Sequence, residues 1–164
     1  MPSVHRQTLV ELVKSNGWTR GAELGVDKGV LFGLLLKSCP DLHLTGVDTF
    51  PDMHRSRRVF DYEAGYSDRC EVLRMTTVEA ARLFEDGHFD FVFIDADHSY
   101  EAVKADIAAW KPKVKHGGWL CGHDYNPKRF PGVVTAVDQA FASNGNGVAH
   151  VVSVYPGDIW GVWR

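Results

Sequence analysis

The chain of 164 residues carries a formal charge of −3, with 45% hydrophobic and 24% charged residues, which is typical of a globular protein with a sizeable core. Without an excess of basic residues, nucleic acid is a poor candidate partner. The longest apolar run, residues 30–36, is too short to cross a membrane, and the first six residues lack the apolar region of a signal peptide.

The number and spacing of the cysteines indicate in which cellular compartment the protein resides. Cys39, Cys70 and Cys121 are odd in number, widely spaced and free of any Cys-x-x-Cys motif. This favours reduced thiols over a disulfide framework or a zinc site. We therefore predict a cytoplasmic protein in which Cys70 and Cys121 are small core residues.

Helical and strand patterns alternate along most of the chain, separated by glycine, proline and asparagine. The predicted segments are, in order, helix 4–15, strand 19–24, helix 30–37, strand 42–47, strand 70–75, helix 78–84, strand 91–94, a helix after Ser99, strand 119–121 and a helix containing Val133, Val137, Ala140 and Phe141. A turn at 144–147 and strands 148–155 and 159–163 then predict an antiparallel hairpin. This order predicts a parallel α/β sheet with helices on both faces and one reversed strand at its end.

The stretch from residue 89 to 124 organises the predicted site. The apolar run 91–94 predicts a strand covered on both faces, and a second buried strand follows the next helix. Because parallel strands joined by a crossover helix end at the same edge, we expect their terminal polar residues to gather on one rim, where ligands of open α/β sheets bind. These residues are Asp95, Asp97, His98, His123 and Asp124.

A glycine-containing loop follows the first strand and suits a nucleoside ligand. Gly25 and Gly29 allow close backbone approach, and Asp48 ends the second strand about 20 residues further on. Asp27 stands where the second glycine of Gly-x-Gly-x-x-Gly would be, which disfavours a dinucleotide. A nucleoside with a short carboxylate tail still fits. The alternative is that the glycines form a tight turn and Asp48 is an ordinary cap or turn residue.

Four motifs together resemble the class I S-adenosylmethionine-dependent methyltransferases, in the branch of the macrocin-type and mycinamicin-type sugar O-methyltransferases and the cephalosporin-hydroxylase-like proteins. They are Glu-Leu-Gly-Val-Asp-Lys-Gly at 23–29, Gly-Val-Asp at 46–48, Phe-Val-Phe-Ile-Asp-Ala-Asp-His-Ser-Tyr at 91–100 and Gly-Gly-Trp-Leu-Cys-Gly-His-Asp-Tyr at 117–125. The resemblance implies a single methyltransferase-like domain over residues 1–164. Its fold would be a Rossmann-like three-layer sandwich, with a seven-stranded, mostly parallel sheet and an antiparallel last strand.

The resemblance also implies a site for S-adenosylmethionine. Glu23 and Gly25 would lie near the methionine portion, Asp48 would bind the ribose, and Thr76 or Thr77, expected to cap the helix at 78–84, would lie near the adenine. The full set of predicted cofactor-binding residues is Glu23, Gly25, Val26, Gly29, Asp48, Thr49, Thr76, Thr77 and Asp95.

By the same resemblance, Asp95, His123 and Asp124 would hold a divalent cation, Mg²⁺ or Mn²⁺, and His98 with Asp95 would be catalytic, His98 as general base. Characterised members have a carboxylate where this chain has His123, and imidazole suits softer ions than Mg²⁺. The alternative for the metal is that Asp95 and Asp124 bind helix amides and water around a metal-free pocket. The alternative for His98 is that it helps to cap the helix at Ser99.

The predicted function is methylation of a hydroxyl on a small molecule such as a sugar or natural product. The alternatives are a nicotinamide-dependent oxidoreductase and a non-catalytic module that binds a cofactor or partner on the same fold. Residues 49–68 form a long connection typical of a lid or binding loop. Its aromatic residues and the terminal hairpin could support a homodimer. Basic residues of the two flanking loops would either receive an anionic substrate or form a solvated face; they are Arg55, Arg57, Arg58, Lys128 and Arg129.

Overall fold

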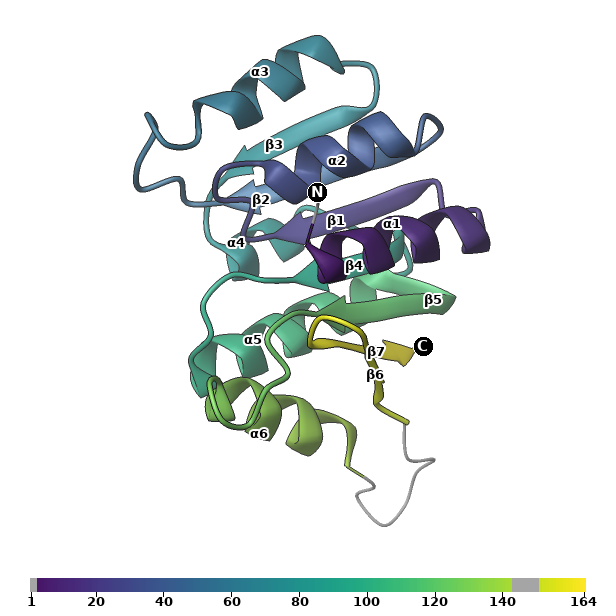
Figure 1. The fold of residues 1–164 in the computed structure, drawn as a ribbon, viewed down its shortest axis with the longest axis vertical. Helices are drawn as coiled ribbons and strands as arrows, with labels where there is room; N and C mark the ends of the chain where they lie inside the picture. The colour runs from purple at the N-terminus through teal and green to yellow at the C-terminus, as the bar shows by residue number, and fades with distance from the viewer. Residues whose placement is uncertain (1–2, 143–150) are drawn as a thin grey trace.

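The computed structural model describes residues 3–142 and 151–164, in which seven strands form one sheet in the order β3-β2-β1-β4-β5-β7-β6 (Figure 1). All pairs from β3 to β5 are parallel, whereas β7 runs antiparallel to both β5 and β6. The predicted mostly parallel sheet with a reversed last strand is therefore confirmed. The strands are β1 (Arg20–Leu24), β2 (His43–Asp48), β3 (Cys70–Arg74), β4 (Phe89–Ile94), β5 (Val114–Gly122), β6 (Ser153–Tyr155) and β7 (Ile159–Trp163).

Helices cover both faces of the sheet, which confirms the three predicted layers (Figure 1). One face packs against α1 (Val4–Asn16), α2 (Val30–Ser38) and α3 (Arg57–Gly65), and the other against α4 (Thr77–Ala81), α5 (Tyr100–Trp110) and α6 (Pro131–Phe141). A short 3₁₀ turn, Lys111–Lys113, follows α5. None of the helices in residues 3–142 and 151–164 is long and apolar enough to span a membrane.

The central strand β4 separates two hydrophobic cores. Phe91 and Phe93 face the core under α1 and α2, while Val92 and Ile94 face the core under α5 and α6. All six residues of β4 are buried, as the continuous apolar run predicted. Each large side chain removed from water in this way contributes about 1.5–3 kcal/mol, so the strand that leads into Asp95 is firmly fixed.

Several boundaries differ from those predicted. Helix α4 ends at Ala81 rather than residue 84, because Phe84 turns back to pack on Phe89 and Trp110, with ring centroids 4.9 and 5.9 Å apart. Strand β5 begins at Val114, well before the predicted 119, since a register shift opposite β4 accommodates the glycines at 117 and 118. In the last hairpin, β6 begins only at Ser153; the predicted turn 144–147 and residues 148–150 lie outside the described residues.

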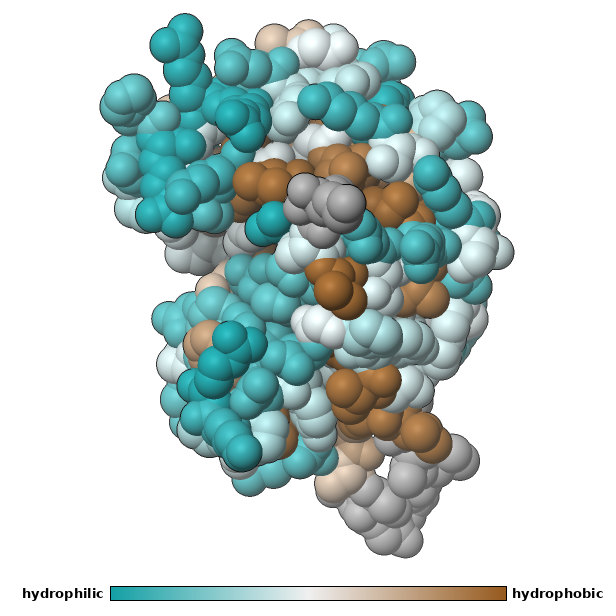
Figure 2. Space-filling model, viewed as in Figure 1, coloured by the Kyte–Doolittle hydropathy of each residue, from teal (hydrophilic) through white to brown (hydrophobic). Residues whose placement is uncertain are grey.

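All three cysteines are buried and free, as predicted. Burial raises the pKa of the Cys70 thiol to about 12, so this thiol is inert at neutral pH. The long connection contains α3, and Phe50 within it is fully buried against Phe60. Phe50 is thus a core residue, whereas Val154 and Trp163 of the terminal hairpin are exposed. Figure 2 shows apolar side chains gathered at the surface near the terminal hairpin.

Candidate functional site

A cavity of about 730 Å³ opens where β1, β2 and β4 end and α4 begins. Six of the predicted cofactor-binding residues line it: Gly25, Asp48, Thr49, Thr76, Thr77 and Asp95. The wall is completed by residues that carried no recognisable signal in the sequence, among them Pro51, Met75 and Ala102. The predicted rim is therefore a real concave surface, large enough for a nucleoside.

Asp48 ties the tip of β2 to the glycine loop. One carboxylate oxygen accepts the backbone N–H of Phe50 at 2.7 Å, and the other accepts the backbone N–H of Asp27 at 2.9 Å. A carboxylate offers about four lone-pair sites, so roughly two remain for a ligand in the cavity. Two backbone bonds fix its orientation, which suits it to accept the hydroxyls of a ribose.

Gly25 is required where the loop crosses β4. Its φ is +88°, and a Cβ built on it would lie 2.1 Å from the backbone oxygen of Asp95. No other residue type fits, because both the left-handed conformation and the backbone contact exclude a side chain. The close approach places the loop directly against Asp95, at the floor of the cavity.

Asp27, in the place of the missing glycine, also has a positive φ of 49°. Its carboxylate makes two contacts with Arg55, at 2.8 Å to Nε and 3.0 Å to Nη2. Arg55 thus joins the long connection to the glycine loop instead of standing free for an anionic substrate.

The helix cap predicted at Thr76 or Thr77 is present. Thr76 forms a capping box with Glu79 at the start of α4. Thr77 donates its hydroxyl to Asp106 of α5 at 2.5 Å, and its carbonyl accepts the indole N–H of Trp110 at 2.9 Å. Burial raises the pKa of the Asp106 carboxyl to about 6. The wall of the cavity is therefore anchored to a buried acid that the sequence did not single out.

A second cavity, of about 300 Å³, adjoins the first and shares Gly25, Asp27 and Asp95 with it. Glu23 and Val26 line this second cavity, together with His5 and Arg6 from α1. Glu23 is only 3% exposed, and burial raises its pKa well above the ordinary range. Nothing in the local sequence pattern indicated that α1 reaches this site.

Gly29 has a different place from the one predicted, since it lines neither of these two cavities. It begins α2 with a φ of +67°, and a Cβ there would lie 2.8 Å from a methyl group of Val59 in α3. Gly29 thus supports the site by letting α2 and α3 pack closely behind the glycine loop.

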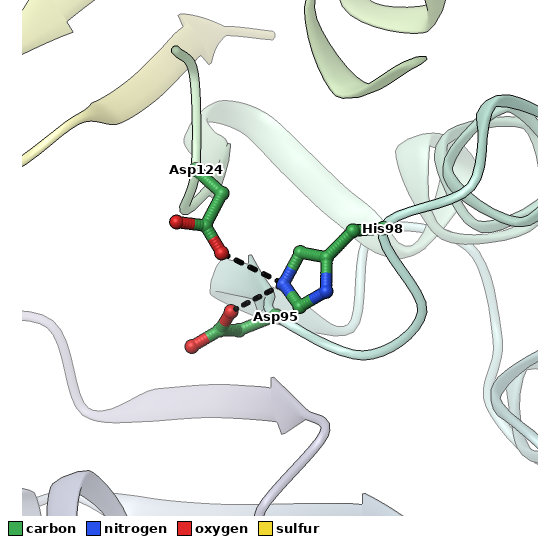
Figure 3. A group of neighbouring side chains, drawn as sticks. All are labelled: Asp95, His98 and Asp124. Carbon is green, nitrogen blue, oxygen red and sulfur yellow. Dashed lines mark hydrogen bonds and ion pairs between the residues drawn. The ribbon is translucent and has the colours of Figure 1, made fainter. Parts of the chain in front are cut away.

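Asp95, His98 and Asp124 meet at the rim between β4 and β5 (Figure 3). The Nε2 atom of His98 lies 2.8 Å from an oxygen of Asp124 and 3.3 Å from an oxygen of Asp95. One potential ligand atom from each residue falls within 4.8 Å of the others.

The start of α5 is capped without His98. The Ser99 hydroxyl accepts the backbone N–H of Ala102, and the Asp97 carboxylate accepts the backbone N–H of Ser99, so His98 is not needed as a cap.

His123 lies beside this group and faces it from the other side. Its Nδ1 atom is 3.3 Å from Asp124 and 3.6 Å from Asp95, and its ring packs 4.2 Å from that of His5. The group that brings its ligand atoms within 4.8 Å contains His98 in place of the predicted His123. The sequence could not separate the two imidazoles, because both follow strand ends at the same edge.

The charges in this group stabilise one another. Hydrogen bonding to Asp95 raises the pKa of His98, with the Asp124 carboxylate adding to the effect. Burial lowers the pKa of His123, but the two carboxylates outweigh it and the net shift is upward. For Asp95, burial raises the pKa, but hydrogen bonds from His123 and His98 bring it below its ordinary value. The resulting arrangement is two acids flanked by two imidazoles, in which the ionised form of Asp95 is favoured.

Comparison with known proteins places the chain in a family. A family model described as "Methyltransferase domain" matches residues 22–125. A search of curated proteins found no match.

Solved structures share the fold at low identity. A putative caffeoyl-CoA O-methyltransferase from Staphylococcus aureus is 14% identical with a TM-score of 0.77, covering 100% of this chain and 85% of that one. The O-methyltransferase from Bacillus cereus in complex with SAH is 18% identical with a TM-score of 0.71, covering 100% and 82%. The MycE methyltransferase of the mycinamycin pathway, in complex with Mg and SAH, is 19% identical with a TM-score of 0.62, covering 91% and 46%.

The family match spans the glycine loop, Asp48, the Asp95–His98 segment and Asp124, which are the residues that build the two cavities and the rim. It confirms the resemblance drawn from the sequence motifs. The chain therefore belongs to the methyltransferase-domain family, within the class I S-adenosylmethionine-dependent methyltransferases.

Proposed function

We propose that the protein transfers the methyl group of S-adenosylmethionine to a hydroxyl of a small molecule, with His98 as the general base. The observation that carries this proposal is the continuity of the site. The nucleoside-sized cavity at Asp48, the smaller cavity at Glu23 and the His98 rim all share Asp95. Three solved methyltransferases of this fold contain SAH, which supports the choice of cofactor, and one of them is described as an O-methyltransferase.

The residues present fit S-adenosylmethionine. The larger cavity has an oriented carboxylate for a ribose, and the smaller one has a carboxylate whose Oε2 atom is buried without a hydrogen-bond partner, that of Glu23. Gly25 lines both cavities and lets the glycine loop pack directly against the backbone of Asp95. A nucleoside joined to a short amino-acid tail matches this division into two compartments.

The chemistry asked of the chain is modest. The cofactor supplies a methyl group on a sulfonium, which is already an activated leaving group. His98 accepts the proton of the acceptor hydroxyl at Nδ1, because Nε2 carries the ring proton and donates it to Asp124 and Asp95. These two acids then stabilise the imidazolium that forms. The cavity walls align acceptor and methyl group, a contribution that can lower the barrier by several kcal/mol.

A divalent cation is a second candidate at the same three residues. Asp95, Asp124 and His98 bring ligand atoms within 4.8 Å, and two carboxylates with one imidazole suit Mn²⁺ better than Mg²⁺. A cation there would lower the pKa of a coordinated acceptor hydroxyl. In that case Nε2 of His98 would hold the metal and Nδ1 would carry the ring proton, so His98 could not also act as the base. Turnover that survives exhaustive chelation of divalent cations supports His98 as the general base. Turnover that is lost on chelation and restored by Mn²⁺ supports His98 as a metal ligand.

Ligand binding tests the cofactor directly. SAH should raise the melting temperature of the protein, whereas NADH, the ligand of the oxidoreductase alternative, should not. Asp48→Ala should remove the SAH effect because the ribose loses its acceptor. A control variant, Asp41→Ala, replaces an exposed acid at the opposite end of β2 and should leave the shift intact. No shift of the parent protein at saturating SAH would contradict the proposal.

Catalysis is tested separately from binding. His98→Ala should lower turnover about 100-fold to 10,000-fold while SAH affinity stays close to that of the parent. If SAH binds and no tested hydroxyl acceptor is methylated by the parent, and His98→Ala and Asp95→Ala change nothing, the non-catalytic alternative gains support.

Two further expectations concern the setting of the protein. Three buried, free cysteines fit the reducing cytoplasm, which is the location we propose.

A homodimer would use the terminal hairpin, where Val154 and Trp163 offer exposed apolar surface. Sedimentation of the parent and of a Trp163→Lys variant tests whether this surface forms the dimer.

A further inference from the structure

Two side chains of the smaller cavity, a guanidinium and a carboxyl group, have buried polar atoms without partners. The Nε atom of Arg6 and the Oε2 atom of Glu23 have no hydrogen-bond partner, and both residues line this space. Among the described residues, neither side chain forms an ion pair. Buried polar groups are nearly always satisfied, so two unsatisfied ones on residues that line one cavity indicate that a ligand completes them.

The kind of ligand follows from the two charges. A cation alone would satisfy Glu23 and repel Arg6, and an anion alone would do the reverse. A zwitterion satisfies both, because its ammonium can meet the carboxylate while its carboxylate meets the guanidinium. The guanidinium is well suited to this, since its planar donors match a carboxylate in a bidentate arrangement.

We propose that Arg6 binds the α-carboxylate of the amino-acid portion of S-adenosylmethionine, beside Glu23, which the family resemblance already implies for this portion of the cofactor. This inference rests on the proposed function and extends the cofactor site to α1, which lies before the segment matched by the family model. Arg6 is then the residue that distinguishes a cofactor carrying an amino acid from a simple adenosine thioether.

The other cationic groups of the cavity are less suited to this role. Lys28 is exposed, so its ammonium is solvated. His5 is half-buried, with its ring packed 4.2 Å from that of His123 and its Nε2 atom 3.3 Å from the Ser3 hydroxyl, so it is already engaged within the protein. His98 also lines the cavity, but its Nε2 atom is already paired with Asp124 and Asp95. Arg6 is then the remaining cation among the described lining residues.

The first turn of α1 is held where Arg6 needs it. A Cβ on Gly157, in the turn between β6 and β7, would lie 2.6 Å from the backbone nitrogen of His5. The hydroxyl of Thr8 donates to the carbonyl of Pro156 at 3.4 Å. The terminal hairpin therefore presses the start of α1 onto the rim, which positions Arg6 over the cavity.

Three ligands separate the contributions. SAH carries both charges, 5′-deoxy-5′-(3-aminopropylthio)adenosine lacks the carboxylate, and 5′-methylthioadenosine lacks the whole amino acid. Dissociation constants are measured by calorimetry for the parent protein, Arg6→Gln, Arg6→Lys and the control Lys14→Gln, which changes an exposed cation on the same helix. Circular dichroism checks that each variant is folded.

We expect Arg6→Gln to weaken SAH binding about 10-fold to 100-fold and to leave both carboxylate-free ligands within about 2-fold of the parent. Arg6→Lys should recover part of the loss, and Lys14→Gln should match the parent. Equal weakening of all three ligands would mean a displaced helix and would overturn the inference, as would no change in SAH binding. A parent protein that binds the thioethers as tightly as SAH refutes the role of Arg6 but not the proposed function; a parent that binds none of the three refutes both.

Discussion

Asp106 gives a prediction whose size follows from the structure. This carboxyl is 2% exposed within α5 and accepts the Thr77 hydroxyl at the wall of the larger cavity. Burial raises its pKa from 3.8 to about 6. The folded protein therefore binds this proton more tightly than the unfolded chain, so the contribution favours folding at low pH and is lost as pH rises from about 4 to about 6.

The magnitude is set by the difference of about two pH units. At ~1.4 kcal/mol per unit, ionising Asp106 in the folded state costs about 3 kcal/mol by neutral pH. Asp106→Asn has no such ionisation. Its amide introduces a donor of its own, which shifts its stability by a constant amount at every pH. The pH dependence of the difference between the two proteins is therefore the informative quantity.

The assay is urea unfolding of the parent and of Asp106→Asn at several pH values from 4 to 7.5. The free energy of unfolding of the variant, relative to the parent, should rise by about 3 kcal/mol across this range. The exposed Asp41→Asn variant controls for the loss of one negative charge and should show no comparable rise. A flat difference for Asp106→Asn would refute the reasoning, because it would mean that the carboxyl ionises in the folded protein as easily as in water.

Three further predictions concern the local architecture of the site. Gly25→Ala should abolish SAH binding and lower the free energy of unfolding by several kcal/mol, because its Cβ would lie 2.1 Å from the Asp95 carbonyl oxygen. The control variant Gly65→Ala, which has open space around its Cβ, should be neutral or slightly stabilising in thermal unfolding. A Gly25→Ala protein that still binds SAH would contradict the close packing of the loop on β4. Thr76→Ala should lose about 1 kcal/mol with the capping box, while Thr76→Ser keeps it; equal melting temperatures for the two variants would argue against the cap. Arg55→Met should weaken SAH binding at most about 5-fold, because the exposed ion pair with Asp27 stabilises the glycine loop only weakly. A loss of SAH affinity above 100-fold would show instead that Arg55 contacts the ligand.

The sequence predicted which segments form helices and which form strands, because this depends on the local pattern of apolar and polar residues. The run 91–94 has no polar residue and is fully buried as β4, and Ser99 and Thr76 cap the helices as their residue types predict. The parallel arrangement then follows from the alternation of strands and helices, and it brings Asp48, Asp95 and Asp124 to one edge. Element ends were less predictable, as Phe84 shows by leaving the helical pattern for an aromatic contact.

The sequence by itself thus determined the sheet, its rim and the chemical groups delivered to that rim, since hydrophobic runs and strand–helix alternation leave few other arrangements. Only the tertiary structure decided which groups touch. It placed His98 nearer than His123 to form a group with both acids, paired Arg55 with Asp27, and brought Arg6 of α1 to Glu23's cavity. These are contacts between segments far apart in the chain, set by how helices and loops pack on the sheet, and no local pattern encodes them.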